Sequence, residues 1–223
     1  MPMVQSSTSN FDSFLFAQIQ SIKPRGLILD MDDTLYWESN FVSEFARVMR
    51  RKVLLEKGQL QADQFFVFFT ENWCGGDRRE IFQRSVLKFN LERITASDFL
   101  ASMRTLVVPH GLALRTWAKR ALAELGTPIA VLTNGDQIIQ KNKFSQLSPK
   151  KLIQDVELFC AKDYEPKPSG LGALTIIKKW DFAPADVLLI GDSSLDLACA
   201  KDAGCGFLYS IGSSQATANW RMH

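Results

Sequence analysis

The sequence predicts an α/β fold in which helices cover both faces of a parallel sheet and an all-helical module interrupts the chain. Short apolar runs alternate with amphipathic stretches in the second half of the chain, as expected of strands that pair in parallel. Polar segments rich in aspartate follow directly after several of these runs. The window 39–107 instead has helical periodicity and holds nine of the 16 phenylalanines, which indicates a separate module.

The composition is that of an ordinary globular protein. Of 223 residues, 46% are hydrophobic, and 26 basic side chains accompany 24 acidic ones, for a net charge of +2. This balance gives no basic excess for a phosphate backbone, so nucleic acid is not an expected partner. No apolar run approaches the roughly 18 to 20 residues that span a bilayer, and the N-terminus lacks a signal-peptide pattern. We therefore expect a cytoplasmic protein without a membrane partner.

The first elements are a helix and a buried strand, and the helical module follows them. Apolar residues recur with helical spacing over 11–22, and Ser9 or Asn10 is the expected cap. The run 26–30 is short and apolar and ends in an aspartate, which favours a buried strand. We expect the α/β core at 1–38 and 108–223 and the helical insert at 39–107, with an interhelical turn near 73–79.

Strands and helices alternate again after the insert. The expected helices are one that ends at Gly126, one that begins at Asp136, one over 171–177 and one over 194–204, and the expected strands are 129–132, 187–190 and 206–209. The segment between the second and third of these helices has no clear pattern.

Cysteine and histidine usage narrows the possible chemistry. The four cysteines include no Cys-x-x-Cys pair, so reduced thiols are expected instead of disulfides or a zinc site. The two histidines, His110 and His223, are too few for a histidine cluster. We therefore expect any chemistry to depend on carboxylates.

Polar side chains stand where three of the predicted strands end. Asp30 and Asp32 follow the first strand, Thr133 and Asn134 follow the second, and Asp192 follows a later one. The carboxyl ends of parallel strands share one edge of a sheet, so these side chains should meet there.

Crowded carboxylates repel each other unless a cation lies between them, and an all-oxygen set with a nearby phosphate suits Mg²⁺. A hydroxyl from Thr133 and an ammonium from Lys167 suit the remaining phosphate oxygens. One carboxylate is then available as a nucleophile on phosphorus, and a second, two residues away, is available to exchange a proton with the leaving oxygen.

Four segments carry a family resemblance. They are Leu-Asp-Met-Asp-Asp-Thr-Leu at 29–35, Val-Leu-Thr-Asn-Gly at 131–135, Lys167-Pro168, and Ile-Gly-Asp-Ser-Ser-Leu-Asp at 190–196. In this order they resemble the motifs of the haloacid dehalogenase-like (HAD) hydrolase superfamily. Gln140 and Lys143 strengthen the likeness to its phosphoglycolate-phosphatase-like branch. The resemblance covers 26–38 and 108–210 and implies a Rossmann-like core with an inserted helical cap.

The resemblance also implies a role for each motif residue. Asp30 would be the nucleophile and Asp32 the general acid and base. Thr133, the main chain of Asn134 and Lys167 would bind the phosphoryl group, and Lys167 would also orient the nucleophile. The Mg²⁺ ligands would be the carboxylates of Asp30 and Asp192 and the main-chain carbonyl of Asp32. Asp196 would support these ligands or bind the ion through water.

The second aspartate of the first motif favours phosphoryl transfer, because dehalogenases of the superfamily lack it. The sequence thus predicts a magnesium-dependent phosphatase that acts on a small phosphorylated metabolite. A sugar-phosphate mutase and a non-catalytic protein of the same fold are the alternatives. The identity of the phosphomonoester and the oligomeric state stay open at this point.

Overall fold

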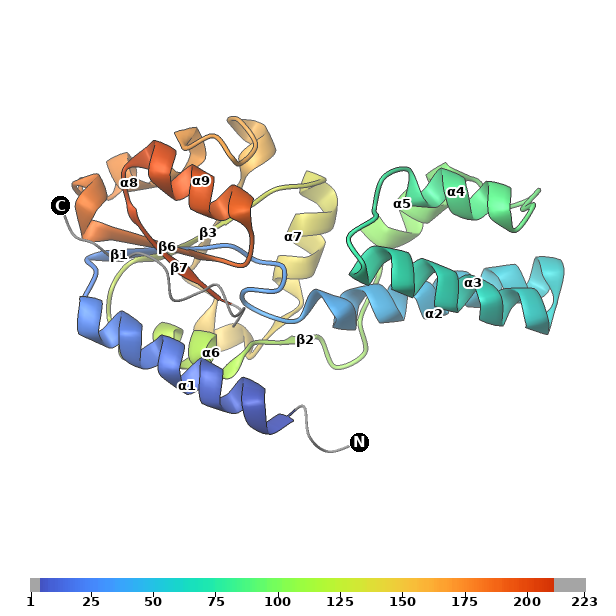
Figure 1. Cartoon of the computed structure of the whole chain (residues 1–223), viewed down its shortest axis with the longest axis horizontal. Coiled ribbons are helices and arrows are strands. Elements are labelled where there is room, and N and C mark those ends of the chain that lie inside the picture. Colours follow the sequence, from blue (N-terminus) through green and yellow to red (C-terminus); the bar gives the residue numbers. More distant parts are fainter. Residues whose placement is uncertain (1–4, 211–223) are drawn as a thin grey trace. The chain divides into compact units, whose positions relative to one another are not determined.

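The computed structural model describes residues 5–210 of the chain (Figure 1). The chain divides into two compact units. The core unit holds the residues up to Trp37 and those from Ala113 onward, and the helical unit is Glu38–Leu112. The helical unit thus extends five residues beyond the expected end at 107.

The core unit is built on the predicted parallel sheet. Its five strands lie in the order β5-β3-β1-β6-β7, and every neighbouring pair is parallel. The central strand β1 aligns Leu27 with Ile129 of β3 on one side and with Leu188 of β6 on the other. The strand bounds are β1 Gly26–Leu29, β3 Ile129–Thr133, β5 Glu157–Cys160, β6 Val187–Gly191 and β7 Gly206–Tyr209.

Helices cover both faces of this sheet, as the sequence predicts. Helices α8 (Leu171–Lys179) and α9 (Ser194–Ala203) lie on one face, and α1 (Gln5–Ile22) and α6 (Thr116–Glu124) lie on the other (Figure 1). The three central strands β3, β1 and β6 are buried except for Ile129 at the start of β3, as is typical of a parallel sheet between two helix layers. The edge strands β5 and β7 are partly exposed. Helix α7 (Gln137–Ser145) follows β3, and the remaining short elements are β2 Leu112–Ala113, β4 Leu147–Ser148, and three 3-10 turns at Lys150–Leu152, Ala161–Asp163 and Pro184–Asp186.

Two details of the core unit differ from the sequence prediction. Helix α1 begins at Gln5, so Ser9 and Asn10 lie inside the helix and do not cap it. Strand β5 was not predicted, because its four residues begin with a glutamate and such a short segment has no diagnostic period.

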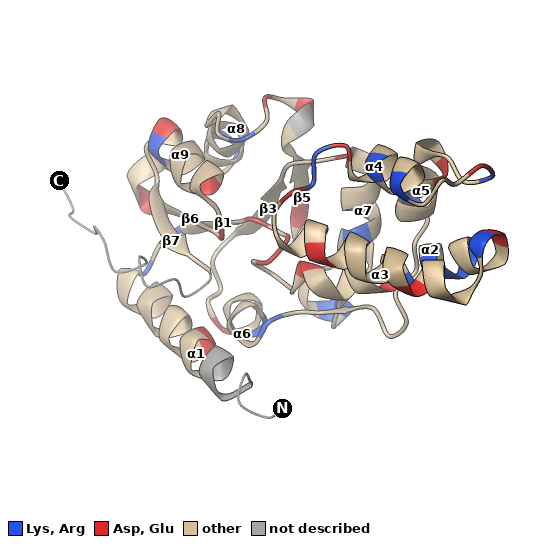
Figure 2. Ribbon diagram, turned by 45° about the vertical axis from the view of Figure 1, so that its right-hand side comes forward, with Lys and Arg blue, Asp and Glu red and all other residues tan. Residues whose placement is uncertain are grey.

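The helical unit consists of α2 (Glu38–Lys57), α3 (Gln59–Cys74), α4 (Ile81–Lys88) and α5 (Ala96–Arg104). Its core is aromatic: Phe65 and Phe69 are fully buried, with ring centroids 5.7 Å apart. Both signs of charge are spread over these helices (Figure 2). In residues 5–210, no helix combines the length and the apolar character needed to cross a bilayer.

Candidate active site

Three carboxylates meet at the carboxyl edge of the sheet. Asp30 follows β1, Asp192 follows β6, and Asp196 lies in the first turn of α9. Each offers one oxygen atom, and these three oxygens lie within 4.8 Å of one another. The sheet order reverses at β1, since β3 and β5 lie on one side and β6 and β7 on the other. Open parallel sheets bind their ligands at such a reversal point.

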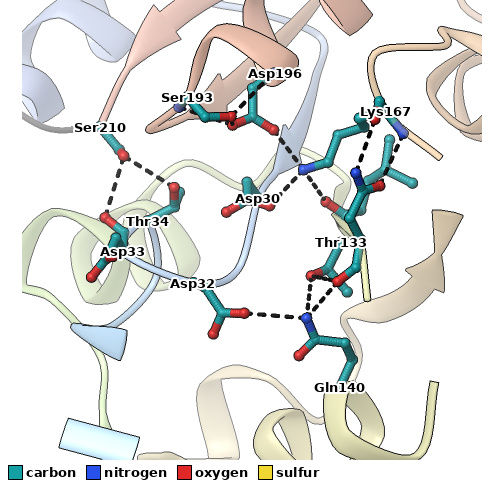
Figure 3. A network of polar contacts seen from close by, with 12 residues as sticks. Asp30, Asp32, Asp33, Thr34, Thr133, Gln140, Lys167, Ser193, Asp196 and Ser210 are labelled. Carbon is teal, nitrogen blue, oxygen red and sulfur yellow. Dashed lines mark hydrogen bonds and ion pairs between the residues drawn. The ribbon is translucent and has the colours of Figure 1, made fainter. Parts of the chain in front are cut away.

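Lys167 joins two of these carboxylates. Its Nζ atom donates to Asp30 Oδ1 and to Asp196 Oδ1, each at 2.5 Å, and to the Leu132 carbonyl at 3.2 Å (Figure 3). The Lys167 side chain is 4% exposed, and a buried ammonium requires acceptors of this kind. The side-chain amide of Asn134 holds the peptide of Lys167, because Oδ1 accepts from its N–H at 2.9 Å and Nδ2 donates to its carbonyl at 3.0 Å.

The start of α9 places Asp196 beside the other two acids. A capping box joins it to Ser193, whose Oγ accepts from the Asp196 N–H at 3.3 Å while Asp196 Oδ2 accepts from the Ser193 N–H at 3.0 Å. A Cβ atom at Gly191 would lie 2.6 Å from Asp196 Oδ2. Glycine at the end of β6 therefore makes room for this carboxylate.

Asp32 lies in a second polar group. Both of its carboxylate oxygens accept from Lys143 Nζ at 2.9 Å, and the Tyr36 hydroxyl donates to Oδ1. Gln140 Nε2 donates to Oδ2 at 3.1 Å. Gln140 and Lys143 are three residues apart on the buried face of α7. Asp136 caps this helix by accepting two main-chain N–H bonds at 3.1 Å, so the cap fixes where both side chains point.

Gln140 also connects Asp32 to the end of β3. Its Nε2 atom donates to Thr133 Oγ1 at 3.1 Å and to the Asn134 carbonyl at 2.5 Å (Figure 3). Gly135 has a φ of 114° and a Cβ there would lie 3.0 Å from Gln140 Nε2. Glycine thus provides both the backbone conformation and the space that bring Gln140 to Thr133.

Burial disfavours the charged forms of Asp30 and Asp192, and the single positive charge of Lys167 does not fully offset this effect. Burial raises the pKa of Asp30 to about 8, and the charges of Asp196 and Asp192 add to this rise while Lys167 opposes it. Burial, followed by the charge of Asp196, raises the pKa of Asp192 to about 6. A second cation beside these acids would stabilise their charged forms.

The pKa of Asp32 shifts in the opposite direction, below its usual value. Burial favours its neutral form, but the Lys143 ammonium and the hydrogen bonds from Tyr36 and Gln140 outweigh it and lower the pKa of Asp32 below its usual value. These contacts therefore favour the carboxylate form of Asp32 over its protonated form.

The donor set fits a hard divalent cation. All three acids offer carboxylate oxygens, the ligands that Mg²⁺ prefers. Because burial raises the pKa of Asp30 and of Asp192, a cation beside them would favour their charged forms. Oxygen atoms within 4.8 Å of one another can share one ion.

The structure brings the residues singled out in the sequence to one edge of the sheet, but in two groups. Asp30, Asp192 and Lys167 belong to one group, and Gln140 joins Asp32 and Thr133 in the other. The contact of Tyr36 with Asp32 was not predicted, although their separation of four residues permits it. Nor was the side-chain contact of Asn134 with the Lys167 peptide predicted.

Comparisons with known proteins identify the family and the fold. The sequence model of the haloacid dehalogenase-like hydrolase family matches residues 27–209. No match was found among curated proteins.

Several solved structures have a similar fold. One is YfnB of Bacillus subtilis, which is named as a HAD-hydrolase and was solved with bound magnesium. Its TM-score to this chain is 0.61 and its sequence identity is 18%, and the alignment covers 83% of this chain and 86% of YfnB. A protein of Thermotoga maritima named as a β-phosphoglucomutase has a TM-score of 0.59 and 18% identity over 86% and 89% of the two chains. A HAD family hydrolase of Deinococcus radiodurans with bound phosphate and sodium has a TM-score of 0.54 and 18% identity, and the alignment covers 83% of this chain and 80% of that one.

At this identity the structural similarity shows the fold alone, whereas the sequence match spans most of the chain, including every motif of the site. The chain belongs to the haloacid dehalogenase-like hydrolase family.

Proposed function

We propose that this protein is a magnesium-dependent phosphatase that hydrolyses a small phosphomonoester through an aspartyl-phosphate intermediate. One observation carries the proposal. The oxygens of Asp30, Asp192 and Asp196 lie within 4.8 Å of one another, and the Lys167 ammonium bonds to two of these acids. Such a site offers a nucleophile and charge neutralisation, which are the main requirements of phosphoryl transfer.

Asp30, Asp192 and the main-chain carbonyl of Asp32 would hold the Mg²⁺ ion, with Asp196 beside them. When bound, the ion would offset charge on the acids and orient the phosphoryl oxygens. Lys167 contributes a second positive charge at the same place and holds one oxygen of Asp30 through its 2.5 Å bond. This bond leaves the other oxygen of Asp30 available to attack.

In the first step the free Asp30 oxygen attacks phosphorus, and the bond between phosphorus and the ester oxygen breaks. Asp32, in its protonated form, gives the leaving oxygen a proton, and the product alcohol departs. The hydroxyl of Thr133 and the main-chain N–H of Asn134 bind the phosphoryl oxygens during the transfer.

In the second step a water molecule attacks the aspartyl-phosphate. The Asp32 carboxylate accepts a proton from that water, inorganic phosphate forms, and Asp30 regains its free carboxylate. The contacts of Asp32 with Lys143 and Gln140 favour the carboxylate and so suit this step.

A phosphomutase is the nearest alternative, because one structural neighbour is named as a β-phosphoglucomutase. In a mutase, a second hydroxyl of the substrate accepts the phosphoryl group instead of water. A non-catalytic protein of this fold is a further alternative, but the intact set of Asp30, Asp32, Thr133, Lys167 and Asp192 favours an enzyme.

A substrate screen tests the proposal. The purified protein is incubated with sugar phosphates, phosphoglycolate, nucleoside monophosphates and a generic aryl phosphate, with and without Mg²⁺, and released phosphate is measured. The Asp30→Asn variant serves as the blank. We expect phosphate release that requires both Mg²⁺ and Asp30.

Rearranged sugar phosphate without release of inorganic phosphate would favour the mutase. Absence of turnover for every compound, with Mg²⁺ present, would favour the non-catalytic alternative. Release that persists in the Asp30→Asn protein would contradict the proposed nucleophile.

A further inference from the structure

Helix α1 lies outside the segment 27–209 that matches the family, yet it contributes a buried charge to the core unit. Asp12 of α1 is paired with Arg115, 103 residues further along the chain: Arg115 Nη2 donates to Asp12 Oδ1 at 2.6 Å. The exposed fractions of the two side chains are 8% and 2%. The second oxygen of Asp12 accepts from the main-chain N–H of Thr116 at 3.0 Å, so both oxygens are engaged at the start of α6.

Arg115 in turn holds the second half of the first motif and the residues that follow it, up to Trp37. Its Nη1 atom donates to the main-chain carbonyl of Asp33 at 3.0 Å, and its own N–H donates to the Leu35 carbonyl at 2.8 Å. The guanidinium also lies 4.3 Å from the ring centroid of Trp37, the last residue of the core unit before the helical unit. One side chain thus contacts the segment 33–37 at its two ends.

The backbone at Asp33 needs such support. Its φ of 54° lies in the left-handed region, which costs a residue with a Cβ on the order of 1 kcal/mol. Besides Arg115, the hydroxyl of Ser210 contacts the Asp33 carbonyl at 3.4 Å and the Thr34 hydroxyl at 3.0 Å (Figure 3). Asp33 directly follows Asp32, so a shift of this turn would displace the Asp32 side chain and its main-chain carbonyl.

A buried ion pair is an inefficient way to gain stability. Desolvation of the two charges offsets most of their attraction, and a pair of apolar side chains of similar size often stabilises a protein as well. Here the Nε atom of Arg115 is also buried without a hydrogen-bond partner. The pair does, however, aim a donor at the Asp33 carbonyl, which an apolar pair cannot do.

We propose that Asp12 and Arg115 are positioning residues for the active site. Asp12 fixes the Arg115 guanidinium, and the guanidinium fixes the turn at Asp33 and thereby the placement of Asp32. Helix α1 is then part of the catalytic apparatus and not only a cover for the sheet. The catalytic consequence rests on the proposed function, whereas the effect on the turn does not.

The test uses the full chain with both charges removed, Asp12→Leu together with Arg115→Met. The matched control is Arg120→Met, which removes another arginine that joins α6 to α1, since the Arg120 guanidinium lies 3.9 Å from the Phe16 ring centroid. Three quantities are measured: the unfolding temperature, kcat and KM for an aryl phosphate with Mg²⁺, and amide hydrogen exchange in 31–37.

We expect the double variant to unfold within a few degrees of the wild type, to lose roughly 10- to 100-fold in kcat with little change in KM, and to exchange at least about tenfold faster in 31–37. The control should match the wild type in all three. Asp12→Asn, which keeps the side-chain shape, should fall between them in kcat and in exchange, but it should unfold at a lower temperature than the double variant because it leaves the Arg115 charge buried and unpaired. If the double variant does not fold, Arg115→Lys replaces it, since this change keeps the charge beside Asp12 but removes the fork of donors that reaches both Asp12 and the Asp33 carbonyl.

Exchange in 31–37 as slow as in the Arg120→Met control would overturn the proposal, as would an unchanged kcat. If the wild type hydrolyses no phosphate ester, the proposed function fails, but the exchange measurement still decides whether the pair holds the turn.

Discussion

Replacing Asp30 with asparagine is expected to lower kcat by roughly 10⁴- to 10⁶-fold, the range observed when other enzymes lose a member of a nucleophilic catalytic unit. The neutral amide cannot attack phosphorus and form the covalent intermediate. The fold should persist, because asparagine has the same shape and Lys167 keeps its 2.5 Å bond to Asp196. Phosphate release under saturating substrate, measured alongside circular dichroism, checks both expectations.

The matched control is Asp186→Asn, the same chemical change at a partly exposed position of the core unit where the carboxylate pairs with Arg25. It should leave kcat unchanged. An Asp30→Asn protein that is folded and retains the wild-type rate would remove Asp30 from the mechanism.

Replacing Lys167 with methionine is expected to destabilise the fold by about 3 to 5 kcal/mol when no divalent ion is present. The variant keeps the length of the side chain but leaves the carboxylates of Asp30 and Asp196 without the ammonium that they share. Both acids are buried, so water cannot replace the ammonium in stabilising their charges. Urea unfolding in the presence of a chelator measures the loss, and added Mg²⁺ should recover part of it.

Lys179→Met is the control for this substitution. Lys179 also forms a 2.5 Å ion pair, with Glu157, but both side chains are more than half exposed. Exposed pairs contribute at most about 1 kcal/mol, so the control should lose little stability. Equal losses in the two variants would mean that Lys167 does not balance a buried acid cluster.

The parts of the site that depend on strand ends could be predicted from the sequence. Asp30 and Asp192 each follow a short apolar run, and parallel strands bring such positions to one edge, where the two acids do lie together. Helix α7 could also be predicted from the sequence, because Asp136 is a common cap residue and directly precedes a helical pattern.

Contacts between distant side chains could not be predicted in this way. Asp12 and Arg115 are 103 residues apart, and no local pattern relates them. Gln140 and Lys143 were noted only as part of the family resemblance, and their bonds to Asp32 depend on how α7 packs after β3. The start of α1 was misplaced because Ser9 and Asn10 are common caps, and the sequence alone does not show that the helix continues through them.

The central claim is that Asp30 and Asp192 hold one divalent ion, and equilibrium binding of Mn²⁺ tests it most directly. Mn²⁺ suits the same oxygen ligands as Mg²⁺, and free Mn²⁺ is measured by electron paramagnetic resonance without any substrate. The wild type and the Asp186→Asn control should each bind one ion per chain at this site, and Asp192→Asn should weaken that binding by at least about tenfold. Equal affinity in all three proteins, or no binding to the wild type, would contradict the claim.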